Sequence, residues 1–174
     1  MTKEEKALLD TLAYCEGTLG VSNNGYDVVV GSKRVIAGWT KDTKIVHGNM
    51  DWYDKATKST AAGRYQFLYS TWIGSKKINL PMTKENQDKR GLELINKALG
   101  DIDKTQLINK NTFDAALNKM ALTWASIPVT KDIVDSKGNV HKAGYSYYSG
   151  DGVNKSKLTS DKIFEIYKLA LSKY

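Results

Sequence analysis

The chain has 174 residues, 41% of them hydrophobic and 26% charged, a composition typical of one globular domain with a sizeable core. No apolar run is long enough to cross a membrane, the single cysteine excludes an internal disulfide, and the two histidines and one cysteine lie too far apart to give a metal-ligand spacing. The net charge of +7 is spread over both halves of the chain without a basic arm, so it favours anionic polymers in general and predicts no particular partner.

The first predicted element is a helix that begins after Thr2 and ends at Gly17. Thr2 and Glu5 have the spacing of a capping box, and glycine is favoured just past a helix C-terminus. Inward-facing positions recur between these ends at the three- and four-residue spacing of a buried helix face: Ala7, Leu8, Thr11, Leu12 and Cys15. Glu16 is therefore expected on the last turn, at the edge of the apolar face.

Two effects are expected to raise the pKa of Glu16. Partial burial disfavours the charged carboxylate, and the negative end of the helix dipole disfavours it again. A carboxylic acid that stays protonated near neutral pH is what general acid catalysis needs, so Glu16 is a candidate catalytic acid. The alternative is a solvated glutamate at a fraying helix end. The neighbouring Cys15 has two interpretations as well: a nucleophile with His47 or His141 as its base, or a small buried apolar residue.

A turn at residues 22–25 (Ser-Asn-Asn-Gly) follows the first helix. Two short runs rich in valine and isoleucine, residues 26–31 and 34–39, then predict a β-hairpin. The polar loop at residues 41–58 is long for a compact domain, and long loops are often binding lips or lids.

Further helices are expected at residues 68–77, 83–99 and 111–124, and from about residue 160 to the C-terminus. The helix at 111–124 has the most regular apolar face: Phe113, Ala116, Leu117, Met120, Ala121 and Trp124. Residues 129–152 are irregular and polar and form either a loop or a second hairpin around residues 136–139. Several helices with a small antiparallel sheet indicate the α+β class.

Four blocks of sequence together resemble the bacteriophage lambda endolysin family. They are residues 13–18 (Ala-Tyr-Cys-Glu-Gly-Thr), 24–31 (Asn-Gly-Tyr-Asp-Val-Val-Val-Gly), 59–66 (Ser-Thr-Ala-Ala-Gly-Arg-Tyr-Gln) and 124–128 (Trp-Ala-Ser-Ile-Pro). All four occur in the family's order and at similar spacing. Residues 129–144 look like an insertion relative to the family, so one wall of the family's cleft is expected to differ here.

The resemblance implies an α+β, lysozyme-like fold: a single catalytic domain over residues 1–174, mostly helical, with one small antiparallel sheet near the N-terminus and a cleft between them. It also implies cleavage of the β-1,4 bond between N-acetylmuramic acid and N-acetylglucosamine in peptidoglycan. The family acts as a lytic transglycosylase, forms 1,6-anhydromuramic acid and needs no cofactor or metal. Its catalytic glutamate falls on Glu16. A hydrolytic glycosidase uses two carboxylates, whereas this reaction needs one, because the sugar's own 6-hydroxyl takes the place of a bound water.

Four further residues are candidates for substrate binding. Asp27, which is 11 residues after Glu16, is the obvious second carboxylate, although aspartate at a strand entrance is also a common turn residue. Tyr65 and Gln66 follow a Gly-Arg step that leaves the backbone free to place them towards the cleft. Gln66 offers donors and acceptors to a sugar amide, or alternatively Arg64 and Gln66 together tie the sheet to the helices. Tyr148, in a glycine-flanked loop, suits stacking on a sugar face.

Three other functions stay open: a hydrolytic muramidase of the same fold, a non-catalytic peptidoglycan-binding protein, and a small basic nucleic-acid binder, for which the sequence shows no supporting motif. We expect peptidoglycan glycan strands as the partner, no nucleic acid, no stable membrane association, and a monomer. The N-terminus lacks the pattern of a secretory signal, since Asp10 interrupts its apolar run. The protein is therefore expected in the host cytoplasm, with access to the cell wall, in the periplasm of a Gram-negative host, through a separate holin-type protein.

Overall fold

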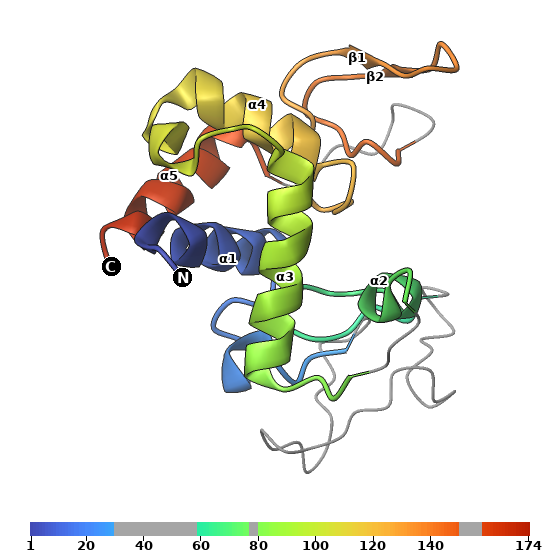
Figure 1. The fold of residues 1–174 in the computed structure, drawn as a ribbon. Helices are drawn as coiled ribbons and strands as arrows, with labels where there is room; N and C mark the ends of the chain where they lie inside the picture. The colour runs from blue at the N-terminus through green and yellow to red at the C-terminus, as the bar shows by residue number, and fades with distance from the viewer. Residues whose placement is uncertain (30–58, 77–79, 150–157) are drawn as a thin grey trace. The chain divides into compact units, whose positions relative to one another are not determined.

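The computed structural model describes residues 1–29, 59–76, 80–149 and 158–174 (Figure 1). The predicted strand at residues 34–39 and the predicted loop at residues 41–58 lie outside these ranges. The described residues form two compact units, one of Leu12–Gly91 and the other of Met1–Thr11 with Leu92–Tyr174. That the whole chain acts as a single domain stays a prediction.

Helices α1 (Lys3–Cys15) and α3 (Lys84–Leu99) begin and end close to the predicted residues. The capping box of α1 is present, because the Thr2 N–H donates to Glu5 Oε2 at 3.0 Å and the Glu5 N–H donates to Thr2 Oγ1 at 3.3 Å. Thr83 caps α3 by accepting from the Asn86 N–H at 3.2 Å. Both helices run from one compact unit into the other.

The unit that contains both chain ends is built on α4 (Lys110–Met120) and α5 (Ser160–Leu171), preceded by a short 3-10 helix, η3 (Lys104–Ile108) (Figure 1). The ring of Phe113 lies 5.0 Å from the rings of both Phe164 and Tyr167, which joins the two helices through an aromatic cluster. Helix α4 ends four residues before the predicted Trp124. The chain turns there, yet Trp124 remains buried. The pattern of buried apolar residues therefore extends past the end of the helix.

Residues 129–144 contain a hairpin, which settles the choice between loop and hairpin. Strand β1 (Ile133–Val134) pairs antiparallel with β2 (Val140–His141), with Val134 opposite Val140. The carboxylate of Asp135 accepts hydrogen bonds from the backbone N–H groups of Lys137 and Asn139 and closes the turn.

The Leu12–Gly91 unit contains the end of α1, the start of α3, a short 3-10 helix η1 (Asn23–Gly25) and helix α2 (Tyr69–Ile73). Helix α2 is shorter than predicted because Gly74, with a φ of +59°, ends it. Instead of the predicted first strand, the described residues show isolated bridges, in which Val29 pairs with Ala62 and Ala62 pairs with Phe67.

None of the described helices combines the length and apolar character needed to cross a bilayer. In the same residues, no three His, Cys, Asp or Glu side chains gather closely enough to hold a metal ion.

Candidate functional site

Glu16 lies one residue beyond the last residue of α1, at a corner of the chain. Its N–H still donates to the Leu12 carbonyl at 2.9 Å, so the helical hydrogen bonding includes it. Gly17 follows with a φ of +70°, a left-handed conformation that costs glycine little and lets the chain turn sharply. The Glu16 side chain is half-buried. The local sequence therefore places a carboxyl group at the exposed edge of a buried helix end.

Cys15, next to Glu16, is buried. Burial, followed by the charge of Glu16, raises the pKa of the Cys15 thiol to about 12. The thiol is thus protonated at neutral pH, and a protonated thiol is a poor nucleophile. This favours the interpretation of Cys15 as a buried apolar residue.

Gln66 ends a tight turn that begins at Gly63. Its φ of +48° is uncommon for a residue with a side chain. The Gln66 side-chain amide folds back and donates from Nε2 to the Gly63 carbonyl at 2.9 Å and to the Val28 carbonyl at 3.4 Å. The amide hydrogens are therefore directed at backbone carbonyls, and the side-chain carbonyl is the group left to accept a hydrogen bond from a ligand.

Asp27 is adjacent to Val28 and is 8% exposed. Its Oδ2 accepts from the Ser22 hydroxyl at 2.9 Å. Among the described residues, no donor reaches Oδ1 of Asp27, although that atom is buried. A buried carboxylate oxygen without a donor is costly, so Oδ1 is a natural acceptor for any hydroxyl or amide N–H that reaches it.

Tyr65 occupies a different position from the one predicted. Its side chain is 1% exposed, and its hydroxyl donates to Asp88 Oδ1 at 2.6 Å. Tyr26 donates to the same oxygen at 2.8 Å. Burial first, and the charge of Asp88 second, raise the pKa of both phenols, which stay protonated and keep donating. In contrast to the prediction of a substrate contact, we assign Tyr65 a supporting role.

Gln87 and Arg64 hold this region together, and no sequence pattern singled out Gln87. Gln87 is fully buried on α3, donates from Nε2 to the Tyr26 and Met82 carbonyls at 2.9 and 2.8 Å, and accepts from the Arg64 N–H at 2.8 Å. The buried Arg64 guanidinium donates to the Asn24 carbonyl and lies 5.3 Å from the Tyr26 ring. These polar side chains fix the backbone around Asp27 and the turn that ends at Gln66.

Tyr148 belongs to the other compact unit and is described there by itself. It is 58% exposed, so its ring is available to a ligand. Its hydroxyl donates to the Leu122 carbonyl, and Tyr147 packs edge-on against it with ring centroids 5.6 Å apart. These contacts hold Tyr148 at the surface in one orientation.

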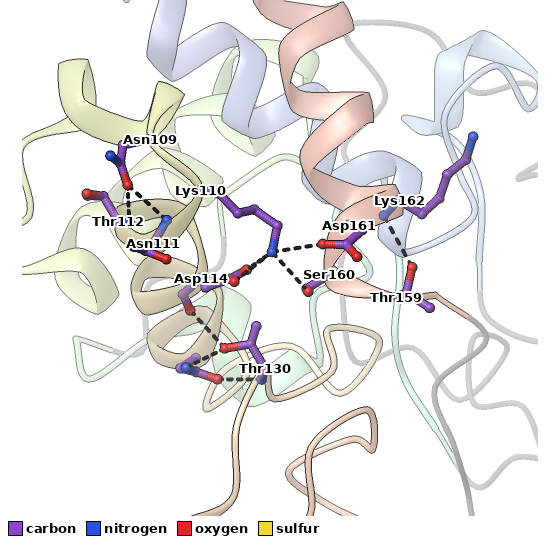
Figure 2. Close-up of polar contacts among 11 residues, drawn as sticks. Asn109, Lys110, Asn111, Thr112, Asp114, Thr130, Thr159, Ser160, Asp161 and Lys162 are labelled. Atoms are coloured by element: carbon purple, nitrogen blue, oxygen red, sulfur yellow. Dashed lines mark hydrogen bonds and ion pairs between the residues drawn. The ribbon is translucent and has the colours of Figure 1, made fainter.

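In the same unit, Lys110 joins the beginnings of α4 and α5 (Figure 2). Its Nζ lies 2.6 Å from Asp114, 3.1 Å from Asp161 and 3.2 Å from the Ser160 hydroxyl. Burial alone would lower the pKa of Lys110, but the hydrogen bonds and charges of the two aspartates outweigh it and raise that pKa. A cavity of about 380 Å³ borders the beginning of α5. On its wall Ser160 is held by Lys110, and the Thr159 hydroxyl accepts from the Lys162 N–H, so these hydroxyls serve the fold.

Comparison with known proteins identifies relatives of this chain. The sequence model of a family described as Endolysin matches residues 6–154. The endolysin of Escherichia phage P2 is 33% identical over 135 aligned residues, which cover 70% of this chain and 78% of the relative. The endolysin of Escherichia phage lambda is 32% identical over 134 aligned residues, which cover 74% of this chain and 79% of the relative.

Solved structures of bacteriophage lambda lysozyme have the same fold as this chain. The structure in complex with a chitohexasaccharide matches with a TM-score of 0.62 and 22% identity, and covers 98% of this chain and 95% of its own. A second structure of lambda lysozyme matches with a TM-score of 0.58 and 24% identity at the same coverage. The prediction of a lysozyme-like α+β fold is confirmed.

Proposed function

This chain belongs to the endolysin family, and we propose that it cleaves the glycan strands of peptidoglycan with Glu16 as its catalytic acid. The finer proposal is a lytic transglycosylase that cuts between N-acetylmuramic acid and N-acetylglucosamine. The observation that supports cleavage is the position of Glu16, half-buried at the corner where α1 ends and beside the buried Cys15 thiol. That setting places a carboxyl group at the surface beside a buried helix end, where a general acid can meet its substrate. The finer proposal rests on the relationship to the lambda endolysin.

The proposed reaction uses one carboxyl group twice. Glu16 donates its proton to the glycosidic oxygen as the bond from that oxygen to the anomeric carbon breaks, which releases N-acetylglucosamine with a free hydroxyl. The Glu16 carboxylate then accepts the proton of the muramic acid 6-hydroxyl while that oxygen bonds to the anomeric carbon. The sugar's acetamido group meets the charge that develops in the ring. No water is consumed, and the 6-hydroxyl gains its advantage from proximity.

Asp27 and Gln66 complete the proposed site as hydrogen-bond acceptors. Oδ1 of Asp27, which receives no donor from the described part of the chain, and the side-chain carbonyl of Gln66 are both acceptors, so a matching ligand presents N–H or O–H groups. N-acetylated sugars carry both. Tyr148 is proposed to supply an aromatic face to a sugar ring.

The experiment that tests this function is product analysis with purified peptidoglycan and the variant Glu16→Gln. The wild-type protein is expected to release muropeptides that are lighter by one water than hydrolysis products, as mass spectrometry would show. Glu16→Gln is expected to fold normally and to lose about 10²–10⁴-fold in turnover, the usual contribution of a general acid. Glu165→Gln, an exposed glutamate on α5, is the matched control and is expected to keep full turnover.

Each failure has a separate meaning. Reducing-end muramic acid in the products would replace the transglycosylase with a hydrolytic muramidase of the same fold. Full turnover of Glu16→Gln would remove Glu16 from the catalytic role. If the wild-type protein releases no soluble product, the remaining candidate is a non-catalytic peptidoglycan-binding protein.

The biological setting proposed for the chain follows from this substrate. We place its action at the bacterial cell wall, in the periplasm of a Gram-negative host, after synthesis in the host cytoplasm. Passage to the wall is assigned to a separate holin-type protein. The working form is proposed to be a monomer that binds glycan strands and no nucleic acid.

A further inference from the structure

Thr18 is buried beside the corner that carries Glu16. Its side chain is 2% exposed, and its hydroxyl oxygen lies 2.5 Å from the Arg64 carbonyl and 3.1 Å from the Ala13 carbonyl. A hydroxyl has one proton, so the shorter contact is the stronger hydrogen bond. Thr18 thus links the end of α1 to a segment 46 residues further along the chain.

The acceptor of this hydrogen bond is itself held in place. The Arg64 N–H donates to Gln87 Oε1 at 2.8 Å, and the Arg64 guanidinium donates to the Asn24 carbonyl. Arg64 stands two residues before Gln66, inside the turn that is closed by a hydrogen bond from the Gln66 N–H to the Gly63 carbonyl at 3.1 Å. The Thr18 hydroxyl therefore sets the spacing between the Glu16 corner and the turn that ends at Gln66.

A third segment packs on the same side chain. A Cβ atom added at Gly25 would lie 2.7 Å from the Cβ of Thr18, closer than real Cβ contacts come, and the φ of Gly25 is +89°. Only glycine permits this approach. Gly25 stands two residues before Asp27. One buried threonine therefore contacts the segments that carry Glu16, Asp27 and Gln66.

We propose that Thr18 is a positioning residue of this site. Its hydroxyl fixes Glu16 relative to the turn that ends at Gln66, so that a sugar bound at this turn lies within reach of the Glu16 proton. The inference rests on the function proposed above, because it presumes Glu16 as the acid. Thr18 does not touch the substrate in this scheme. Its effect passes through the backbone of two neighbouring segments, and a shift of about 1 Å at a reacting group can cost about 10²-fold in rate.

The test compares Thr18→Ser with Thr18→Ala. Both variants lose the methyl group, and they differ only in the hydroxyl. The matched control is the same pair of substitutions at Thr11, which is buried like Thr18. Thr11 lies on α1, and its hydroxyl donates to the Ala7 carbonyl at 2.7 Å within that helix. The turnover number and KM are measured on soluble glycan-strand fragments, below the unfolding temperature of every variant.

Thr18→Ala is expected to lower the turnover number by about 10- to 100-fold, and Thr18→Ser is expected to restore it to near the wild-type value. Both Thr11 variants are expected to keep the wild-type turnover number even where they are less stable. If Thr18→Ala does not fold, Thr18→Val keeps the side-chain volume and carries the same expectation.

Two results would overturn the proposal: a turnover number of Thr18→Ala no lower than that of Thr11→Ala, or an equal loss in Thr18→Ser, which would assign the effect to packing. Glu16→Gln is measured in the same assay. If Glu16→Gln is inactive and Thr18→Ala keeps the turnover number of Thr11→Ala, the positioning role alone fails. If Glu16→Gln is active, the proposed function fails with it.

Discussion

Gly63→Ala tests the packing that holds the turn between Gly63 and Gln66. A Cβ atom at Gly63 would lie 2.3 Å from Gln87 Oε1 and 2.9 Å from Met82 Cε. Gln87 cannot swing away at low cost, because its amide group bonds to three backbone groups on three segments. The added methyl group must therefore push the turn, the start of α3, or both.

The expected loss of stability follows from two separate costs. The φ of Gly63 is +79°, and the left-handed conformation costs a residue with a side chain about 1–2 kcal/mol. Overpacking of a filled site adds about 1–3 kcal/mol, so Gly63→Ala is expected to lower the free energy of unfolding by about 2–5 kcal/mol. Gly138→Ala is the matched control, because Gly138 has a φ of +84° and open space around its Cβ position. Its expected cost is the first contribution alone, about 1–2 kcal/mol.

Urea unfolding followed by circular dichroism measures both variants, and an unchanged dependence on urea concentration shows that the same transition is being compared. Gly63→Ala is also expected to reduce turnover on peptidoglycan, whereas Gly138→Ala, which changes only the hairpin turn, is expected to retain it. If the two variants differ by less than about 0.5 kcal/mol, the size of an ordinary surface substitution, the contact between Gly63 and Gln87 does not constrain the turn as described.

Two further predictions concern titrating groups. The Cys15 thiol, whose pKa burial and Glu16 raise to about 12, should resist iodoacetamide at mildly alkaline pH until urea is added, and Cys15→Ala should retain turnover. Loss of turnover in Cys15→Ala would restore the nucleophile interpretation. The side-chain and backbone hydrogen bonds of Asn139 lower the pKa of Asp135. Because the pKa is lower in the folded state, this stabilisation is present above the ordinary pKa of aspartate and is lost as the pH falls through the folded value. The stability difference between wild type and Asp135→Ala should therefore shrink in strong acid, and a constant difference would contradict the assignment.

The helices could be predicted from the sequence because their signals are local. The capping box of Thr2 and Glu5 forms its two hydrogen bonds within four residues, and Gly100 ends α3 with a φ of +58°. The lysozyme-like fold followed from the resemblance of four sequence blocks. For Glu16, the local pattern predicted a position at a helix end and at the edge of the apolar face, and the structure shows a half-buried side chain there.

The polar network of the Leu12–Gly91 unit could not be predicted in the same way. Gln87 and Asp88 stand among charged residues at the start of α3, where they match the pattern of a solvent-facing helix. Their partners, Arg64 and Tyr65, are 23 residues earlier in the chain. No helical or strand periodicity links residues over that distance. The burial of Tyr65, and with it the loss of its expected sugar contact, depends on this long-range pairing.

This network also explains how the Leu12–Gly91 unit can hold the polar groups of the proposed site in place. Gln87 and Arg64 each join two or more backbone segments, and Thr18 joins two. Removing one partner leaves a buried donor or acceptor unsatisfied, which costs about 1–3 kcal/mol, so alternative arrangements of these segments are disfavoured. An apolar core disfavours empty volume, whereas a hydrogen-bond network also fixes the orientation of the segments that it joins. Substitutions in this network should therefore reduce turnover at temperatures where the protein is still folded. Substitutions in the aromatic cluster around Phe113 should reduce stability first and leave the turnover of the remaining folded protein unchanged.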